Sequence, residues 1–331
     1  MSNSLRNRER SYRFKEANED RDSTTSQFQI PSRPITRFLL DWPYLKRLTD
    51  MILQHDIIHI ALSDGMSSVV DACLPALLAR FLGKKVILDY HYDKAGFDLD
   101  KPGWMTLQLL KSFDKIVVPS PSLTRFLGRY HRDIRTIFEG IDLESIQPRN
   151  ISSLQPMIIA EQRGKRFINT NSLLKAFRLV KAKYPRAELM IICNTSEKDD
   201  IMELAATKHC GGISVIANSP DGTFGQSLAR ADLYINPCYY DNPLPTMMKA
   251  LATGLPIVAA ASSDGETDVI TNGVNGMLFR ENDYTALTDR IIELIESPEM
   301  VKKLSTNAKL MANRFDWQRI INKWLYVYRE L

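Results

Sequence analysis

From about residue 35 to its end, the chain alternates between short apolar runs and longer segments whose apolar residues recur at helical spacing. HDIIHIALS, KKVILDYHY and DKIVVPS are runs of the first kind, and SSVVDACLPALLARFLG is a segment of the second kind. Runs this short and this uniformly apolar are typical of strands buried on both faces of a sheet. Their alternation with helices predicts βαβ units and a parallel sheet covered on both faces.

A polar stretch without periodicity, LESIQPRNISSLQ at residues 143–155, interrupts this alternation and predicts a linker. Beyond it the alternation restarts with the strand candidates PMIIAEQ, AELMIICN, GISVIAN, DLYINPC and PIVAAAS. Helical segments then continue to the C-terminus. Because 331 residues are too many for one ordinary core, the sequence predicts two α/β domains, at residues 35–150 and 151–314.

Residues 1–34 are polar and rich in charges of both signs, so they cannot bury enough apolar surface to offset the entropy of ordering. We expect most of this segment to be disordered or loosely packed. The alternative is a specific binding arm.

Charge and composition exclude several classes of protein. The net charge is +4, the 43 basic and 39 acidic residues are interspersed, and no basic helix or aromatic-basic pattern suggests nucleic acid. The four cysteines lack a CxxC pair and the five histidines form no ligand cluster, so no metal site is expected. No apolar run is long enough to span a membrane, and no signal peptide is present. The sequence therefore indicates a cytoplasmic protein.

A polar loop precedes a helix in YYDNPLPTMMKALATGLP, residues 239–256. In open parallel sheets, ligands bind where the carboxyl ends of the strands lead into helix N-termini. Asp241 and Asn242 follow such a strand and can cap the next helix, whose free N–H groups favour an anionic or hydroxyl-rich ligand. A plain cap and turn is the alternative.

The stretch ARADLYINPCYYDNPLPTMMKALATGLPIVAAASSDGETDVITNGVNGMLF resembles the C-terminal half of the family 4 (group 1) retaining glycosyltransferases. FDKIVVPSPSLTRFL, IRTIFEGIDLESIQP and FDWQRIINKWLYVYREL resemble other blocks of that family, and the likeness covers residues 36–331. It implies the GT-B fold, in which two Rossmann-like parallel-sheet domains face a cleft. It also implies that residues 315–331 form a final helix that packs back toward the N-terminal domain.

The family's E-x7-E motif, which flanks the donor sugar and the ribose, falls on Asp241 and Lys249. Asp241 keeps a carboxylate, whereas an ammonium such as that of Lys249 only donates hydrogen bonds. Three interpretations of Lys249 stay open: the nucleotide is held in another way, the site has lost part of its function, or the lysine is solvated.

Cations that neutralise the donor diphosphate are expected after the first strand of the second domain. The usual lysine position falls near Asn169, so the resemblance leaves this role to the nearby basic residues Arg163, Lys165 and Arg166. As an alternative, these residues are simply solvated.

His91, in LDYHYDKAG, matches the family's histidine that faces the donor sugar. The resemblance thus implies that His91 and Asp241 take part in catalysis. It implies an acceptor contact for Asp64 and Gly65, for which a helix cap is the alternative. The remaining donor-binding residues that it implies are Asn242, Pro243, Leu244, Gly265 and Glu266, together with Lys249.

Family members begin with a strand and a glycine-rich loop, and here the charged tail holds that place. The resemblance therefore implies an incomplete N-terminal domain. A sheet without its first strands exposes an apolar edge, which favours a partner chain or self-association.

The resemblance implies a metal-independent transfer, with retention, of a sugar from a nucleotide diphosphate-sugar to a saccharide or lipid-linked hydroxyl, with no cofactor. The substitution at Lys249 keeps a second hypothesis open, a non-catalytic glycosyltransferase-like subunit that binds a partner or a sugar nucleotide. The basic, aromatic segment 37–47 adds the hypothesis of peripheral contact with the inner face of the membrane.

Overall fold

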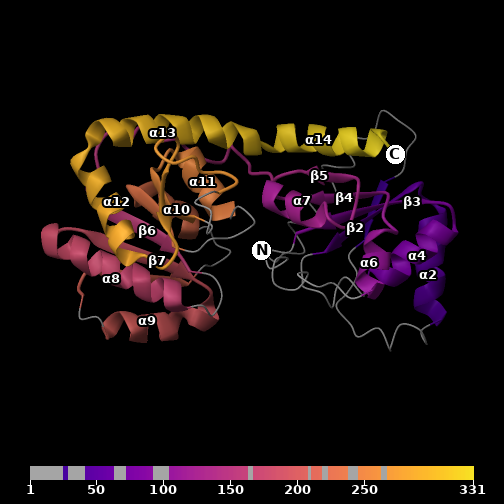
Figure 1. The fold of residues 1–331 in the computed structure, drawn as a ribbon, viewed down its shortest axis with the longest axis horizontal. Helices are drawn as coiled ribbons and strands as arrows, with labels where there is room; N and C mark the ends of the chain where they lie inside the picture. The colour runs from indigo at the N-terminus through magenta and orange to yellow at the C-terminus, as the bar shows by residue number, and fades with distance from the viewer. Residues whose placement is uncertain are drawn as a thin grey trace. The chain divides into compact units, whose positions relative to one another are not determined.

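The structure, a computed structural model, describes residues 25–28, 42–62, 72–91, 104–162, 167–207, 210–217, 223–237, 245–261 and 267–331. The chain divides into two compact units, each built on a parallel sheet (Figure 1). Unit 1 comprises Met1–Glu139 and Ile320–Leu331, and unit 2 comprises Gly140–Arg319. The predicted fold class, two Rossmann-like α/β domains, is therefore confirmed.

The sheet of unit 1 has five strands whose order in space follows their order in the chain. All neighbouring pairs are parallel. The strands are β1 (Thr25–Phe28), β2 (Ile57–Leu62), β3 (Lys85–Tyr90), β4 (Lys115–Val118) and β5 (Ile134–Thr136).

Strand β1 corrects the prediction for the N-terminal segment in part, because Thr25–Phe28 pairs in parallel with β2. The polar residues of this segment gave no apolar signal, but an edge strand needs only backbone hydrogen bonds on one side. The rest of residues 1–34 lies outside the described residues. That the N-terminal domain is incomplete, and that it has a partner chain, stay predictions.

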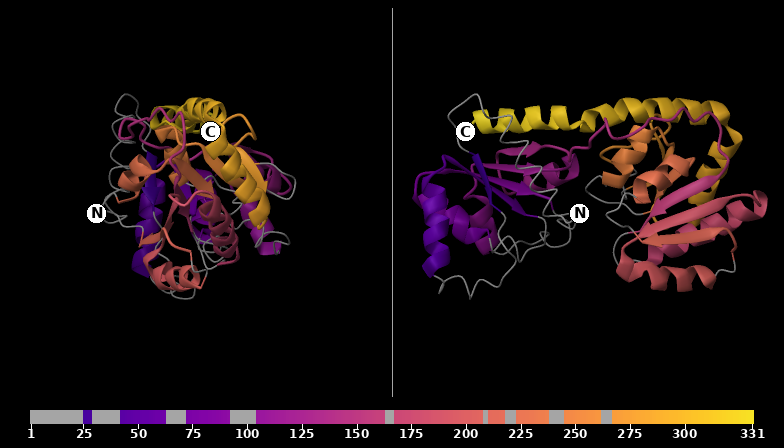
Figure 2. Two further views of the ribbon diagram at one scale, coloured as in Figure 1. Left: turned by 90° about the vertical axis from the view of Figure 1, so that its left-hand side faces the viewer. Right: turned by 180° about the vertical axis from the view of Figure 1, so that it is seen from behind.

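Helices and strands of unit 1 share one apolar core. The helices that follow its strands are α4 (Cys73–Phe81), α6 (Trp104–Leu110) and α7 (Pro121–Leu127), and α2 (Trp42–Leu53) packs against α4. Because each crossover leads to the next strand in the same direction, right-handed connections place these helices on one face (Figure 2). Alternate residues of the strands point into this core: Ile58, Ile60, Leu62, Val86, Leu88, Tyr90, Ile116 and Val118.

The sheet of unit 2 has six parallel strands in the order β11-β10-β9-β6-β7-β8. They are β6 (Met157–Glu161), β7 (Glu188–Cys193), β8 (Ile213–Ala217), β9 (Leu233–Asn236), β10 (Ile257–Ala261) and β11 (Met277–Arg280). The order reverses between β6 and β9, so the carboxyl ends of these two strands lie at the topological switch point, where open α/β sheets bind their ligands.

Helices cover both faces of this second sheet (Figure 1). On one face, α8 (Phe167–Lys183) contacts both α9 (Lys198–Ala206) and α12 (Tyr284–Glu296). On the other, α11 (Pro245–Thr253) contacts both α10 (Thr223–Arg230) and α13 (Pro298–Ala312). The last helix is α14 (Trp317–Arg329). The helical C-terminal segment predicted from periodicity thus consists of α12, α13 and α14.

Strand β11 was not predicted, because its four residues, MLFR, are too few to show a period of their own. Its backbone pairs in parallel with β10 over Val258–Ala261. The turn before it is built by Asn275, whose Oδ1 accepts from the Thr271 N–H at 2.7 Å and whose Nδ2 donates to the Val269 carbonyl at 2.9 Å.

The boundary between the units lies at Glu139 and Gly140, earlier than the predicted linker, because the chain already pairs with unit 2 there. The Ile141 N–H donates to the Phe315 carbonyl at 2.8 Å, and the Trp317 N–H donates to the Ile141 carbonyl at 3.2 Å. The Gly140 Cα lies against the Trp317 indole, where a side chain would have no room.

Gly140→Ala is expected to lower the free energy of unfolding by about 1–3 kcal/mol, because overpacking forces neighbours to shift. An added Cβ would lie 2.6 Å from two ring carbons of Trp317. Urea unfolding measures the change. Gly225→Ala is the matched control, since a Cβ there meets nothing within 4 Å. Equal losses in the two variants would contradict this account of Gly140.

Arg149 fixes the segment that leads into unit 2. Its guanidinium donates to the carbonyl of Ala231 and lies 3.4 Å from Asp232 Oδ1. Its backbone N–H donates to the Thr253 carbonyl at 2.7 Å, and its own carbonyl accepts from Lys309 Nζ at 3.2 Å. One residue therefore ties this segment to the ends of α10, α11 and α13.

Candidate active site

The period of two along β2 and β3 places polar residues on the face opposite the apolar core of unit 1. His59 and Asp89 are buried there, and the register pairs His59 with Ile87 and Ala61 with Asp89. His91 follows β3 directly, in phase with Asp89. Three titratable side chains therefore converge on one face of the sheet near its carboxyl edge.

Asp89 holds His91 in place. Its Oδ1 lies 2.8 Å from His91 Nε2, and the His91 backbone N–H donates to the Leu62 carbonyl at 2.9 Å. The side chain of His91 is 29% exposed, whereas that of Asp89 is 11% exposed. The predicted histidine thus lies at the carboxyl end of a strand, anchored from the sheet side and partly open to solvent.

The same carboxylate faces a second histidine, which α14 covers. His59 Nε2 lies 3.5 Å from Asp89 Oδ2, a long electrostatic contact, and His59 Nδ1 lies 2.6 Å from the Tyr328 hydroxyl. The Trp324 indole stacks on the His59 ring with 4.8 Å between ring centroids. Trp324 and Tyr328 stand one helical turn apart, so the same face of α14 presents both rings.

The surroundings of Asp89 and Tyr328 determine whether these two side chains are ionised. Burial alone would raise the pKa of Asp89, but attraction to His91 and His59, together with the hydrogen bond from His91, outweighs it and holds that pKa well below its usual range. Burial, and the nearby Asp89 carboxylate, raise the pKa of Tyr328 far above its ordinary value. At neutral pH Asp89 is therefore a carboxylate and Tyr328 keeps its proton.

Acid should weaken this part of the fold. The groups facing Asp89 in the described structure are His59, His91 and Tyr328. Because its folded-state pKa is lowered, Asp89 contributes stability above its unfolded pKa of about 3.9 and loses that contribution as the pH falls further. The gap in unfolding free energy between wild type and Asp89→Asn should therefore shrink as the pH falls from about 5 to about 2. Urea unfolding at each pH tests this, and a constant gap would contradict it.

In unit 2, buried polar side chains gather at the carboxyl end of β6. Glu161, the last residue of β6, is 3% exposed, and its Oε2 accepts from the Thr246 hydroxyl and from the Tyr234 hydroxyl at 3.4 Å. Thr246 lies in the first turn of α11. A carboxylate on β6 therefore holds the start of the helix whose N-terminus was predicted to face the ligand.

Further polar contacts extend this cluster along the loop into α8. The Thr170 hydroxyl donates to Gln162 Oε1 at 2.6 Å, and Asn169 Nδ2 donates to Glu281 Oε1 at 2.8 Å. Asn236, the last residue of β9, is also buried, and its Oδ1 has no hydrogen-bond partner among the described residues. Among the described residues, amides, hydroxyls and the Glu161 carboxylate thus border this part of the sheet edge.

Sequence reasoning placed two site residues within the described part of the chain. His91 lies at the carboxyl end of β3, as described above. Lys249 lies on α11 and is half-buried, so it is neither fully solvated nor fully buried. The other predicted site residues lie outside the described residues: Asp64, Gly65, Arg163, Lys165, Arg166, Asp241, Asn242, Pro243, Leu244, Gly265 and Glu266.

Sequence reasoning missed Asp89, His59 and Glu161. The sequence does carry a signal for Asp89 and His59. Both are titratable residues inside otherwise apolar strands, and both occupy strand positions whose side chains point to the same face of the sheet. For Glu161, the only signal is a carboxylate at the end of the apolar run PMIIAEQ. Such a carboxylate is costly to bury without partners.

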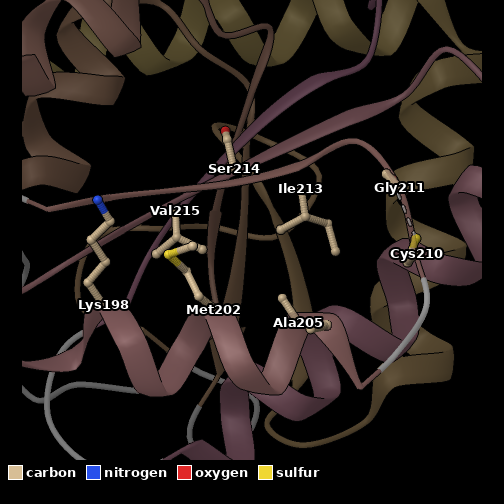
Figure 3. Close-up of a pocket in the computed structure, with 9 residues that line it drawn as sticks. Lys198, Met202, Ala205, Cys210, Gly211, Ile213, Ser214 and Val215 are labelled. Carbon is tan, nitrogen blue, oxygen red and sulfur yellow. Dashed lines mark hydrogen bonds between the residues drawn. The ribbon is translucent and has the colours of Figure 1, made fainter.

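A hollow in unit 2 lies elsewhere. It is formed between α9 and the edge strand β8, where Lys198, Met202 and Ala205 face Ile213 and Val215, while the Ser214 side chain points away from α9 (Figure 3). Its far end is lined by Cys210 and Gly211, before β8 begins. None of the predicted site residues lines this hollow, so it contributes nothing to the candidate site.

The described residues contain no group of three or more His, Cys, Asp or Glu residues that could hold a metal ion. Over the same ranges, no helix combines the length and the apolar character needed to cross a membrane.

Known sequences show similarity over much of the chain. An uncharacterized glycosyltransferase of Haemophilus influenzae is 26% identical over 153 residues, which are 46% of this chain and 43% of that protein. The sulfoquinovosyl transferase of Arabidopsis thaliana is 25% identical over 273 residues, or 74% of this chain and 52% of the relative. The chain therefore spans about half the length of these curated relatives.

Solved structures share the fold. Sucrose-phosphate synthase from Thermosynechococcus elongatus matches 95% of this chain and 86% of its own, with a TM-score of 0.67 and 17% identity. The Anabaena protein HepE, in complex with UDP and glucose, matches 87% of this chain and 82% of its own, with a TM-score of 0.68 and 18% identity. At such low identity these likenesses concern the fold alone.

The sequence model described as "Glycosyl transferases group 1" matches residues 144–311, about half of the chain. The match begins before β6, includes every strand of the second sheet and ends within α13. The polar residues at the carboxyl ends of β6 and β9 thus lie inside it. From this match we conclude that the chain belongs to the group 1 glycosyl transferases.

Proposed function

We propose that this protein transfers a sugar from a nucleotide diphosphate-sugar to a hydroxyl of a saccharide or lipid-linked acceptor, with retention of configuration and without a metal ion. The observation that carries the proposal is the family match across unit 2, which includes the switch point of its sheet. Buried polar side chains border that switch point, as expected where a hydroxyl-rich ligand binds.

The names of similar proteins support the donor class. Relatives and structural neighbours include glycosyl transferases and synthases, and HepE has been crystallised with UDP and glucose. In the proposal, the donor lies over the carboxyl edge of the second sheet. Its diphosphate meets the basic residues that follow β6, namely Arg163, Lys165 and Arg166.

The proposal gives catalytic roles to His91 and Asp241. Asp241 and the amides after it would hold sugar hydroxyls, and His91 would contact the donor sugar. No protein nucleophile is assigned, because retention in this family is explained by a front-face, ion-pair-like route. Rate enhancement then comes from stabilising the charge of the leaving diphosphate and from positioning.

Binding can be tested with the full chain and a panel of UDP-, GDP- and ADP-sugars in a thermal-shift assay. A donor present at a hundredfold excess over its dissociation constant should add about 2.7 kcal/mol to the free energy of unfolding. Stabilisation by one base class identifies the nucleotide. No stabilisation by any of them would remove the donor site from the proposal.

Turnover, stereochemistry and metal need are tested together. The donor that binds is incubated with saccharide acceptors, nucleoside diphosphate release is followed, and NMR of the product reads its anomeric configuration. We expect retention, with the rate unchanged by EDTA. An inverted product or a rate abolished by EDTA would overturn that part of the proposal.

A second candidate, a non-catalytic subunit that binds a sugar nucleotide or a partner, is favoured by one group of residues. Asn169 takes the place of the family's lysine and is bonded to Glu281, while Lys249 takes the place of the second glutamate. A chain that binds a nucleotide sugar tightly but releases no diphosphate with any acceptor or water would favour this candidate.

Membrane contact remains part of the proposal only for an acceptor that is lipid-linked. Trp42, which begins α2, is 75% exposed. Sedimentation with liposomes containing anionic lipid tests this contact, and a protein that stays in the supernatant would exclude it.

A further inference from the structure

Four side chains of unit 1 form a continuous series of polar contacts that ends at the candidate site. Tyr328 on α14 contacts His59 on β2, His59 faces Asp89 on β3, and Asp89 contacts His91. Only His91 has a role in the proposed reaction. His59 and Asp89 are buried and Tyr328 is half-buried, although the strand neighbours Ile87 and Val117 on the same face of the sheet are apolar.

The protons in this series follow from the donors and acceptors present. The Tyr328 hydroxyl keeps its proton and can donate to His59 Nδ1, 2.6 Å away, in the His59 tautomer that carries its proton on Nε2. His59 Nε2 is the nitrogen that faces Asp89 Oδ2. An ionised carboxylate only accepts, so His91 must carry a proton on Nε2, which lies 2.8 Å from Asp89 Oδ1.

This assignment determines the chemistry of His91. With a proton held on Nε2, a neutral imidazole has its lone pair on Nδ1. Such a ring accepts a hydrogen bond through Nδ1, and the imidazolium donates one from the same nitrogen. The backbone bond from His91 to Leu62 and the bond to Asp89 together fix the orientation of the ring.

We propose that Asp89 is a positioning residue for His91, which it holds in the Nε2–H tautomer, and that Tyr328 supports it through His59. This proposal rests on the proposed function, in which His91 contacts the donor sugar. It makes the C-terminal end of α14 part of the candidate site, although Tyr328 and His59 are 269 residues apart in the chain.

Burial supports a purpose beyond packing. A carboxylate that is 11% exposed loses most of its hydration, and an apolar residue of similar size would fill the space at less cost. The Trp324 ring, stacked on His59, shields the contact between His59 and Asp89 from water. An arrangement of this kind resembles the carboxylate–histidine pairs that fix ring tautomers in other sites.

The first measurement needs no substrate. Full-length protein labelled with 15N-histidine gives long-range 1H–15N spectra in which protonated and unprotonated ring nitrogens differ. His91→Gln identifies the signals of His91. We expect wild type to show one His91 tautomer, protonated at Nε2, and Asp89→Asn to show a mixture. Tyr328→Phe should cause a smaller change of the same kind.

The second measurement follows sugar transfer. Asp89→Asn should lower kcat by about 10- to 100-fold with a smaller change in KM, since such supporting contacts typically have effects of this size. Tyr328→Phe keeps the ring and removes only the hydroxyl, so it should lower kcat less and keep the fold. Tyr326→Phe, an exposed tyrosine on the same helix, is the matched control and should change neither readout.

The outcomes separate this proposal from the proposed function. If wild type transfers no sugar, the proposed function fails, and the spectra still decide whether Asp89 sets the tautomer. If Asp89→Asn keeps a single Nε2–H tautomer, the proposal is overturned. It is also overturned if the tautomer changes while kcat does not. If Asp89→Asn fails to fold, the His91 tautomer and the kcat of Tyr328→Phe decide in its place, and the proposal is overturned if neither changes.

Discussion

His91→Ala is expected to slow sugar transfer by about 10²–10³-fold, the usual cost of removing one preorganised hydrogen-bonding group from a reaction centre. His91 stands at the carboxyl end of β3, partly exposed and held by Asp89. The substitution removes the group that would contact the donor sugar. Steady-state rates of diphosphate release at saturating donor measure the effect.

Two further variants make this result specific. His55→Ala removes a half-buried histidine whose hydrogen bond within the described residues is local, from Nδ1 to the Met51 carbonyl at 2.7 Å, and it should leave the rate unchanged. His91→Gln keeps a donor for Asp89 and should preserve the melting temperature while the rate still falls. If His91→Ala transferred sugar as fast as wild type, His91 would have no part in the reaction.

Arg149→Met is expected to cost about 2–3 kcal/mol of unfolding free energy, because it removes the cation beside a partly buried carboxylate and the donor of a carbonyl. The estimate allows for the exposed third of the Arg149 side chain. Asp232 is the carboxylate concerned, and burial raises its pKa even with Arg149 present. Urea unfolding of the full chain, followed by fluorescence, gives the difference.

The pH dependence of this loss has a definite sign. A carboxyl whose pKa is raised on folding favours the fold most when protonated, so the deficit of Arg149→Met should be larger at pH 7 than near pH 4. The double variant Arg149→Met with Asp232→Asn should recover part of the loss at pH 7, as expected of two residues in contact. A deficit independent of both pH and Asp232 would mean that the arginine acts through its carbonyl contact alone.

The parts of the fold that could be predicted from sequence are those with local signals. Strand β10, IVAAA, is completely buried and reads as an apolar run, and α12 begins after Asp283, whose side chain accepts from the Ala286 N–H at 2.9 Å. Each signal lies within a few residues and needs no knowledge of the rest of the chain. The alternation of such elements was sufficient to predict two parallel sheets.

Strands β1 and β11 could not be predicted in the same way. Thr25–Phe28 is polar, and its pairing with β2 depends on an edge made available by residues far along the chain. Met277–Arg280 is too short to favour a strand by itself, and its backbone pairing with β10 makes it one. In both cases tertiary contacts decide the local structure.

Residues of the candidate site could be predicted only where they match a position of the family's sequence pattern. His91 was found through that pattern. The bond from Thr246 to Glu161 joins positions 85 residues apart, so no local pattern could reveal it. No local rule links Tyr328 to His59 either. Long-range polar contacts of this kind become visible only when both partners have been placed by the apolar core.

The discontinuous composition of unit 1 has a consequence for biosynthesis. Residues 140–319 form a contiguous unit that can collapse as soon as it leaves the ribosome. Residues 25–139 emerge before this unit, yet Ile320–Leu331, which belong with them, are synthesised only after all of residues 140–319. Unit 1 should therefore acquire its native state after unit 2, and until then a chaperone would find its uncovered sheet face accessible.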